Sequence, residues 1–136
     1  MVGIAEFIVA ELQLRGHTVT PHGALTDGER PDWGWCCETA ARDVAEGRAD
    51  MAVVCCWTGT GASIAANKVP GIRAALCCDA VTADGARRWN DANVLALSLR
   101  TLTAAILQEV LDAWFSAQAS DEPSDQENVA YVNQIV

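Results

Sequence analysis

The sequence predicts an α/β protein built on a mainly parallel sheet, and two observations support this prediction. Short apolar runs alternate with segments of helical periodicity, an order that requires crossover connections between parallel strands. The strongest apolar run, residues 51–56, passes through a glycine-rich turn directly into a helical segment. Hydrophobic residues make up 51% of the 136 positions, which is enough for one domain with one core.

Helices are expected where apolar residues recur every three or four positions and a glycine or proline follows. The expected helices span residues 3–15, 35–46, 62–67, 82–89 and 101–117. Strands are expected over residues 18–21, 51–56, 72–77 and 94–97. Trp114 lies on the apolar face of the last helix and is assigned to the core. Ligands of such sheets bind beyond the carboxyl ends of the strands, where Cys56, Asp79 and Ser98 lie.

The charge balance argues against partners with phosphate backbones. The formal net charge is −9, whereas nucleic acids and anionic membranes require clustered lysine and arginine. The sequence shows no signal-peptide pattern and no apolar run long enough to cross a bilayer, so a cytoplasmic protein is expected.

The six cysteines form three adjacent pairs, at residues 36–37, 55–56 and 77–78. Neighbours on a strand point to opposite faces, so these pairs suit neither zinc binding nor a disulfide framework. Reduced thiols without a metal are expected, and a thiol-based redox sensor is a weaker hypothesis.

The turn after residues 51–56 is the expected centre of the chemistry. Cys56 ends this strand, and Thr58, Gly59, Thr60 and Gly61 lead into the next helix. Backbone N–H groups at a helix N-terminus can face an anion, and glycine allows the backbone to approach a ligand closely. A thiol at this place is stabilised as a thiolate and can act as a base. The alternatives are a buried apolar thiol and a plain strand-to-helix turn.

Residues 56–74, CWTGTGASIAANKVPGIRA, closely resemble the ribose-5-phosphate isomerase type B family, which includes the galactose-6-phosphate isomerase subunits. The resemblance extends to residues 90–97 (NDANVLAL), to Arg100 and to residues 111–114 (LDAW). It covers roughly residues 3–115. The long run after the turn is specific to the family, whereas TGTG alone would not be.

The resemblance implies a Rossmann-like three-layer sandwich, a homodimer or homotetramer, and aldose–ketose isomerisation through an enediolate without metal or organic cofactor. It assigns the base to Cys56 and the binding of the enediolate oxygens to residues 58–61. Asn90 becomes a substrate contact and Arg100 a candidate for an anionic group. The alternatives are a helix C-terminal residue for Asn90 and a solvated side chain for Arg100.

Three departures from the family pattern concern the substrate. The histidine that usually precedes the Asn-Asp pair and opens the sugar ring is Trp89 here. Family members also carry arginines near the C-terminus that bind phosphate, but this chain has no lysine or arginine after Arg100. The glycine that usually follows the catalytic cysteine is Trp57, which is expected to narrow the pocket.

The two ends of the chain also differ from the family. Family members begin with a central strand ending in an Asp-His pair, and that strand is missing, so we expect a native N-terminal segment to be absent; a rearranged sheet is the alternative. The isomerase-like domain is expected to span residues 1–117. Residues 118–136 are expected to form an acidic tail or an arm that docks on a second subunit.

The sequence therefore predicts an aldose–ketose isomerase of a pentose or hexose, with a phosphorylated sugar favoured, and with Cys56 and Thr58 as catalytic residues. The alternative is a non-catalytic sugar-binding or assembly homologue. His17 and His22 are expected at the surface. Trp33 and Trp35 are assigned to packing, with cover of a partner's site as the alternative.

Overall fold

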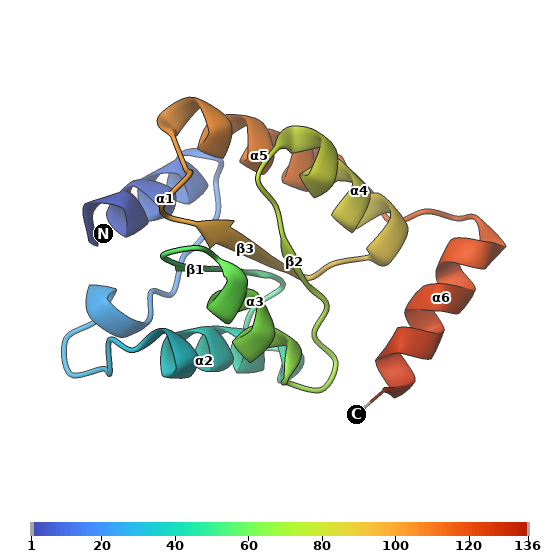
Figure 1. Ribbon diagram of the computed structural model, residues 1–136, viewed down its shortest axis with the longest axis horizontal. Helices are drawn as coiled ribbons and strands as arrows, with labels where there is room; N and C mark the ends of the chain where they lie inside the picture. Colours follow the sequence, from blue (N-terminus) through green and yellow to red (C-terminus); the bar gives the residue numbers. More distant parts are fainter. Residues whose placement is uncertain (1, 136) are drawn as a thin grey trace.

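The computed structural model describes residues 2–135, in which three strands alternate with helices (Figure 1). The elements are α1 (Val2–Leu14), η1 (Gly23–Leu25), α2 (Trp33–Ala45), β1 (Ala52–Cys56), α3 (Thr60–Asn67), β2 (Ala74–Leu76), α4 (Ala80–Asn90), β3 (Val94–Ser98), α5 (Ala104–Ser116) and α6 (Pro123–Gln134). Within residues 2–135, no helix is both long and apolar enough to span a membrane.

The three strands form a parallel sheet in the order β1-β3-β2, which confirms the predicted fold class. β3 is the central strand because it pairs with β1 from Ala52↔Val94 to Cys56↔Ser98 and with β2 from Ala74↔Val94 onward. The carboxyl ends of β1 and β3 therefore lie side by side. The other edge of β1 has no strand neighbour from residues 2–135.

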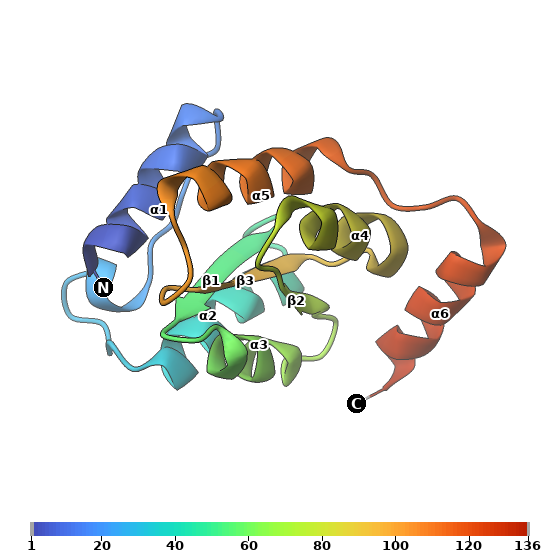
Figure 2. The same cartoon turned by 45° about the horizontal axis from the view of Figure 1, so that its top comes forward.

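Helices cover both faces of the sheet, so the domain has three layers (Figures 1 and 2). On one face, Leu95 and Leu97 of β3 pack with α1, α4 and α5. On the other face, Val94 and Ala96 pack with α2 and α3. Since successive side chains of a strand point to opposite faces, a central strand covered on both sides must be apolar throughout.

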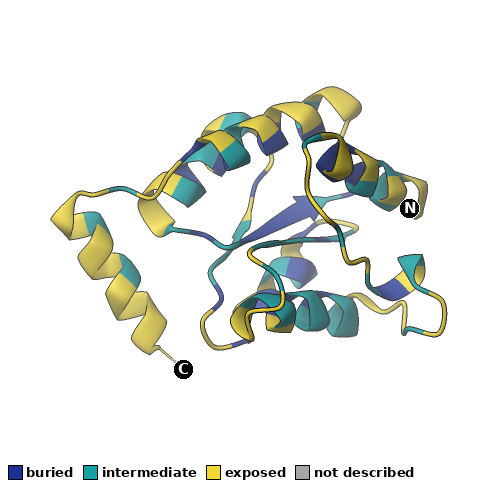
Figure 3. Ribbon diagram, turned by 180° about the vertical axis from the view of Figure 1, so that it is seen from behind, coloured by how far each residue is buried: buried dark blue, intermediate teal, exposed yellow. Residues whose placement is uncertain are grey.

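The core lies along β3 and the inner faces of α4 and α5, as the burial colours show (Figure 3). Trp114 is fully buried, which confirms its assignment to the core. Its indole Nε1 donates to the sulfur of Met51 at 3.3 Å, and the guanidinium carbon of Arg87 lies 5.6 Å from the centroid of its ring.

Side-chain caps fix the first residues of three helices. The carboxylate of Asp32 accepts from Trp35 N at 3.1 Å, so α2 begins at Trp33, two residues before the predicted start. Asp79 caps α4 through Thr82 N, and Thr103 caps α5 through Ile106 N. Each cap satisfies a backbone N–H that the first turn of a helix leaves without a partner.

The predicted strand at residues 18–21 is wrong. These residues connect α1 to η1 without pairing with any strand of the described sheet. Pro21 has no N–H to donate to a ladder, and its carbonyl accepts the hydroxyl of Thr26 within the same loop. Alternation of residue types alone cannot supply the neighbouring strand that this segment would need.

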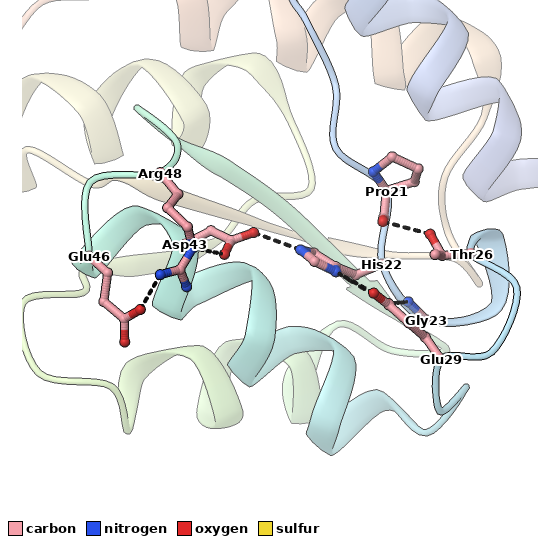
Figure 4. A network of polar contacts seen from close by, with 8 residues as sticks. All are labelled: Pro21, His22, Gly23, Thr26, Glu29, Asp43, Glu46 and Arg48. Carbon is pink, nitrogen blue, oxygen red and sulfur yellow. Dashed lines mark hydrogen bonds and ion pairs between the residues drawn. The ribbon is translucent and has the colours of Figure 1, made fainter.

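A network of polar contacts holds this loop on α2 (Figure 4). His22 Nε2 lies 2.6 Å from Asp43 of α2, and His22 Nδ1 lies 3.2 Å from both carboxylate oxygens of Glu29. The side chain of His22 is only 16% exposed, so the expectation of a surface histidine is wrong. Asp43 is also bound by Arg48 at 2.8 Å.

The two carboxylates beside His22 favour its protonated form. Partial burial alone would lower the pKa of His22, but its hydrogen bonds with Asp43 and Glu29 outweigh this effect, and its pKa is raised. The backbone N–H of Gly23 and the imidazole together lower the pKa of Glu29. When it is protonated, the ring forms one ion pair with Asp43, which links the loop to α2, and a second ion pair with Glu29 within the loop.

The expected acidic tail contains a helix, α6, in which no residue is buried. Figure 2 shows α6 standing to one side of the three layers. Hydrogen bonds tether this region to the body: Ser120 N donates to Arg88 O at 2.7 Å, and Arg73 Nη1 donates to Asn133 Oδ1 at 2.8 Å.

Candidate active site

The candidate site lies at the carboxyl edge of the sheet, where the turn after β1 is bound to the segment after β3. Leu99 N donates to the carbonyl of Cys56 at 3.0 Å, and Arg100 N donates to the carbonyl of Trp57 at 2.9 Å. The hydroxyl of Ser98 also donates to the carbonyl of Trp57. The strand-to-helix turn is thereby fixed against the central strand.

Gly59 allows the turn to pass close to that strand. Its φ is +78°, in the left-handed region. A β-carbon at this position would lie 3.0 Å from the carbonyl carbon and oxygen of Leu97 and 2.5 Å from Cδ1 of Leu76. No other residue type combines this backbone angle with so little space.

The N-terminus of α3 offers backbone donors beside the thiol of Cys56. Ala62 N lies 3.4 Å from Cys56 Sγ, and Ser63 N donates to Gly59 O at 3.0 Å. For residues 58–61, no hydrogen bond of the backbone N–H groups is found within the described part of the chain. Such N–H groups and the positive end of the helix dipole together favour a negative charge at this place.

Gly61 also makes room for a side chain, a role that the sequence did not suggest. We expected it to admit a ligand to the backbone; in addition, an added β-carbon would meet three ring atoms of Trp33 at 2.9–3.1 Å. The indole of Trp33, from the start of α2, thus lies directly against Gly61. Sequence reasoning assigned Trp33 to packing and did not connect it with the turn, because the contact depends on how α2 and α3 lie together.

Cys56 is distinct from the other cysteines of the interior, although all six are free thiols. Burial raises the pKa of Cys55 to about 11 and the pKa values of Cys37 and Cys77 to about 12, so these thiols stay protonated. Cys56 is half-buried and is the cysteine whose sulfur meets the N-terminus of α3.

Arg100 is exposed and follows β3 directly, and its backbone N–H binds the carbonyl beside Cys56. No ion pair of its side chain occurs within residues 2–135, so its guanidinium is available at this edge. Asp79 also follows a strand, but its carboxylate is occupied in capping α4.

Asn90 lies near the amino-terminal ends of the strands, whereas Cys56 lies at their carboxyl-terminal ends. It ends α4 just before β3 begins, whereas Cys56 ends β1, and Ala52 at the start of β1 pairs with Val94. The length of β1 therefore separates the amino-terminal ends of the strands from their carboxyl-terminal ends by roughly 13 Å. Trp89 and Asn90 line a shallow groove between the body and α6 instead. One chain alone does not bring Asn90 to the thiol.

Both histidines of the chain are engaged with side chains other than the thiol. His17 stacks on Phe115 near the end of α5, with ring centroids 4.1 Å apart, and His22 is bound to Asp43 near the end of α2. Among residues 2–135, no group of three or more His, Cys, Asp or Glu side chains is arranged to hold a metal ion.

The sequence model of the family described as Ribose/Galactose Isomerase matches residues 1–132. The chain is 40% identical to ribose-5-phosphate isomerase B of Escherichia coli over 111 residues, which cover 82% of this chain and 74% of that protein. It is 36% identical to D-erythrulose-4-phosphate isomerase of Pectobacterium atrosepticum over 117 residues, which cover 86% of this chain and 77% of that protein.

Solved structures agree with these matches. The type B ribose 5-phosphate isomerase of Trypanosoma brucei is 39% identical and superposes with a TM-score of 0.85, covering 97% of this chain and 89% of that one. The similarity thus includes the strand, turn and helix that carry Cys56 and the backbone donors. By sequence and by fold, this chain belongs to the ribose/galactose isomerase family of sugar-phosphate isomerases.

Proposed function

We propose that the protein interconverts an aldose and a ketose of a phosphorylated sugar, with Cys56 as the base. The observation that carries this proposal is the position of Cys56 Sγ, 3.4 Å from Ala62 N and beside the unpaired N–H groups of residues 58–61. A base and a set of fixed donors are what proton transfer next to a carbonyl requires.

The chemistry proceeds by two proton transfers at carbon and one between the two oxygens. The thiolate of Cys56 removes the proton from the carbon beside the carbonyl; the C–H electron pair forms a C=C bond, and the carbonyl electrons move to oxygen. The N–H groups of residues 58–61 stabilise the resulting enediolate, with the Thr58 hydroxyl beside them to exchange the proton between the two oxygens. The thiol then returns its proton to the neighbouring carbon, which leaves the isomeric sugar.

An open-chain substrate fits this edge of the sheet best. Opening a sugar ring requires a group that transfers protons to and from the ring oxygens, but His17 and His22 lie elsewhere and are engaged. A four-carbon sugar phosphorylated on its terminal carbon cannot close a five- or six-membered ring. One relative is named D-erythrulose-4-phosphate isomerase, so we infer that a tetrose 4-phosphate is the first substrate to test, with Arg100 near its phosphate.

Solvent deuterium incorporation tests the proposal directly. The wild-type protein is expected to incorporate deuterium beside the carbonyl of erythrose 4-phosphate, ribose 5-phosphate or a hexose 6-phosphate. Cys56→Ala should abolish the exchange. Cys55→Ala is the matched control. The thiol of Cys55 stays protonated because of its burial, so its loss should not affect the exchange.

Two results would count against this mechanism. Exchange that survives in Cys56→Ala would move the base to another group. The absence of exchange with every sugar would favour the alternative of a non-catalytic sugar-binding homologue.

We further propose that a homodimer completes the site. If Asn90 contacts the substrate, it must come from a second copy, because its own chain holds it at the opposite edge of the sheet. The helix α6 exposes Tyr131, Val132 and Ile135, which are 67%, 48% and 62% accessible, and burial of these side chains would favour association.

Mixing two inactive variants tests the shared site. Cys56→Ala and Asn90→Ala chains, unfolded and refolded together, should recover up to about a quarter of the wild-type activity, because one site of the mixed dimer is intact. Sedimentation should show a dimer. A monomer, or a mixture that stays inactive, would contradict the proposal.

A further inference from the structure

The indole of Trp33 is a large and partly exposed apolar group that packs against the donor turn of residues 58–61. Its ring atoms Cζ3, Cε3 and Cη2 lie 2.9–3.1 Å from the place of a β-carbon on Gly61. Even so, 53% of the Trp33 side chain remains accessible. One part of the ring is therefore held against the backbone of α3, and much of the remainder is open.

The main chain around Trp33 is held in place from both sides. Asp32 caps α2 through Trp35 N and is paired with Arg30, whose Nε lies 2.8 Å from its carboxylate. Upstream, the contact of His22 with Asp43 links the same loop to α2 (Figure 4). An indole whose backbone is fixed in this way loses little conformational freedom when a ligand packs on it.

Trp33 is also close to the thiol. Gly61 joins Ala62, whose N–H lies 3.4 Å from Cys56 Sγ, so standard backbone dimensions place the ring within roughly 10 Å of the sulfur. A short sugar phosphate bound by the N–H groups of residues 58–61 would lie between these two side chains.

We propose that Trp33 is a substrate-binding residue that packs its indole on the C–H face of the sugar. This inference rests on the proposed function. It assigns one wall of the substrate pocket, the indole face of Trp33. The carbon chain of a sugar carries hydrogens as well as hydroxyls, and an amphipathic aromatic ring is suited to cover the hydrogen-bearing side. The N–H groups would hold the reacting oxygens while the indole holds the carbon chain.

A wall of this kind binds substrate and transition state equally. Loss of the ring should therefore raise KM and leave kcat nearly unchanged. A purely structural role predicts the opposite, because a displaced Gly61 would disturb the donor turn and lower kcat.

The experiment compares Trp33→Ala, Trp33→Phe and Trp35→Ala in the deuterium-exchange assay with erythrose 4-phosphate and ribose 5-phosphate. Trp33→Ala is expected to raise KM about tenfold with kcat within twofold of the wild type, and Trp33→Phe should restore most of the affinity. Trp35→Ala, on the same turn of α2, is the matched control and should keep the wild-type KM. A KM within twofold of the wild type in Trp33→Ala, or a fall in kcat at constant KM, would overturn the inference.

Binding separates this inference from the proposed function. Titration with erythrose 4-phosphate should change the tryptophan fluorescence of the wild type and of Trp35→Phe, and the change should be smaller in Trp33→Phe, in which Trp57 still reports binding. If the wild type shows this signal but exchanges no deuterium, the isomerase proposal fails and the role of Trp33 stands. If Trp33→Phe keeps the whole signal, the role of Trp33 fails regardless of the activity.

Discussion

Replacing Gly59 with alanine is expected to destabilise the protein through two separate effects. The first is conformational, because φ of +78° costs a residue with a β-carbon about 1–2 kcal/mol. The second is crowding, because the new carbon would lie 3.0 Å from the backbone carbonyl of Leu97. Leu76, 40% exposed, can move aside, but the central strand cannot. Overpacking of this kind costs about 1–3 kcal/mol, so the total is about 2–5 kcal/mol.

Gly71 provides the matched control. Its φ is +86°, and nothing lies within 4 Å of the β-carbon that an alanine would add. Gly71→Ala should therefore lose only the conformational part, about 1–2 kcal/mol. The difference between the two variants measures how closely the turn approaches β3.

Urea unfolding followed by circular dichroism gives both free energies of unfolding. In thermal unfolding, each kcal/mol should correspond to roughly 3 °C in Tm. If the two alanine variants unfold at the same urea concentration, the close packing of the turn on Leu97 is wrong, and with it the fixed geometry of the N–H groups.

Two further predictions concern the interior and the loop. Trp114→Ala should cost about 3–5 kcal/mol in urea unfolding because this side chain is fully buried, whereas Val81→Ala, at a side chain that is 78% exposed, should change stability by about 0.5 kcal/mol at most; equal effects would refute the burial. For His22→Gln, the raised pKa of the imidazole means that its stabilisation is fully present below its ordinary value of 6.5 and is lost as pH rises through the folded-state pKa. The difference in the free energy of unfolding between wild type and His22→Gln, measured with urea, should therefore shrink as pH rises above the folded-state pKa of His22. A difference that grows with pH would show that the protonated ring forms no stabilising ion pairs. At the acid end, the carboxylate of Asp43, whose pKa is lowered by His22 and Arg48 despite its burial, loses its contribution as pH falls through its folded-state value.

The sequence predicts most of the fold because its signals are local. Residues 51–56 and 94–97 are apolar runs with helical segments between them, and both are strands in the structure. The failed strand at residues 18–21 shows the limit, since a strand exists only when another strand lies beside it. The helix α6 was missed because its acidic first turn and apolar end resemble a tail, and no residue of it is buried.

The candidate site was predictable where it is continuous in the chain. Cys56 and residues 58–61 stand next to one another in the sequence, so the resemblance and the chemistry point to the same place. Contacts between distant segments could not be read in this way. The ring of Trp33 meets Gly61 across two helices, and His22 meets Asp43 across 21 positions. Each depends on how α2 packs.

The contact between Trp33 and Gly61 separates two tasks that many active sites combine in one segment. In the proposed site, proton transfer would belong to residues 56–61 at the end of β1, whereas the surface that packs on the sugar would come from Trp33, the first residue of α2. A change at position 33 would reshape the proposed sugar pocket while the residues that carry the thiol and the N–H groups stay the same. The protein thus offers one position at which a small library could redirect substrate preference, provided that position 61 remains glycine whenever the wall is aromatic.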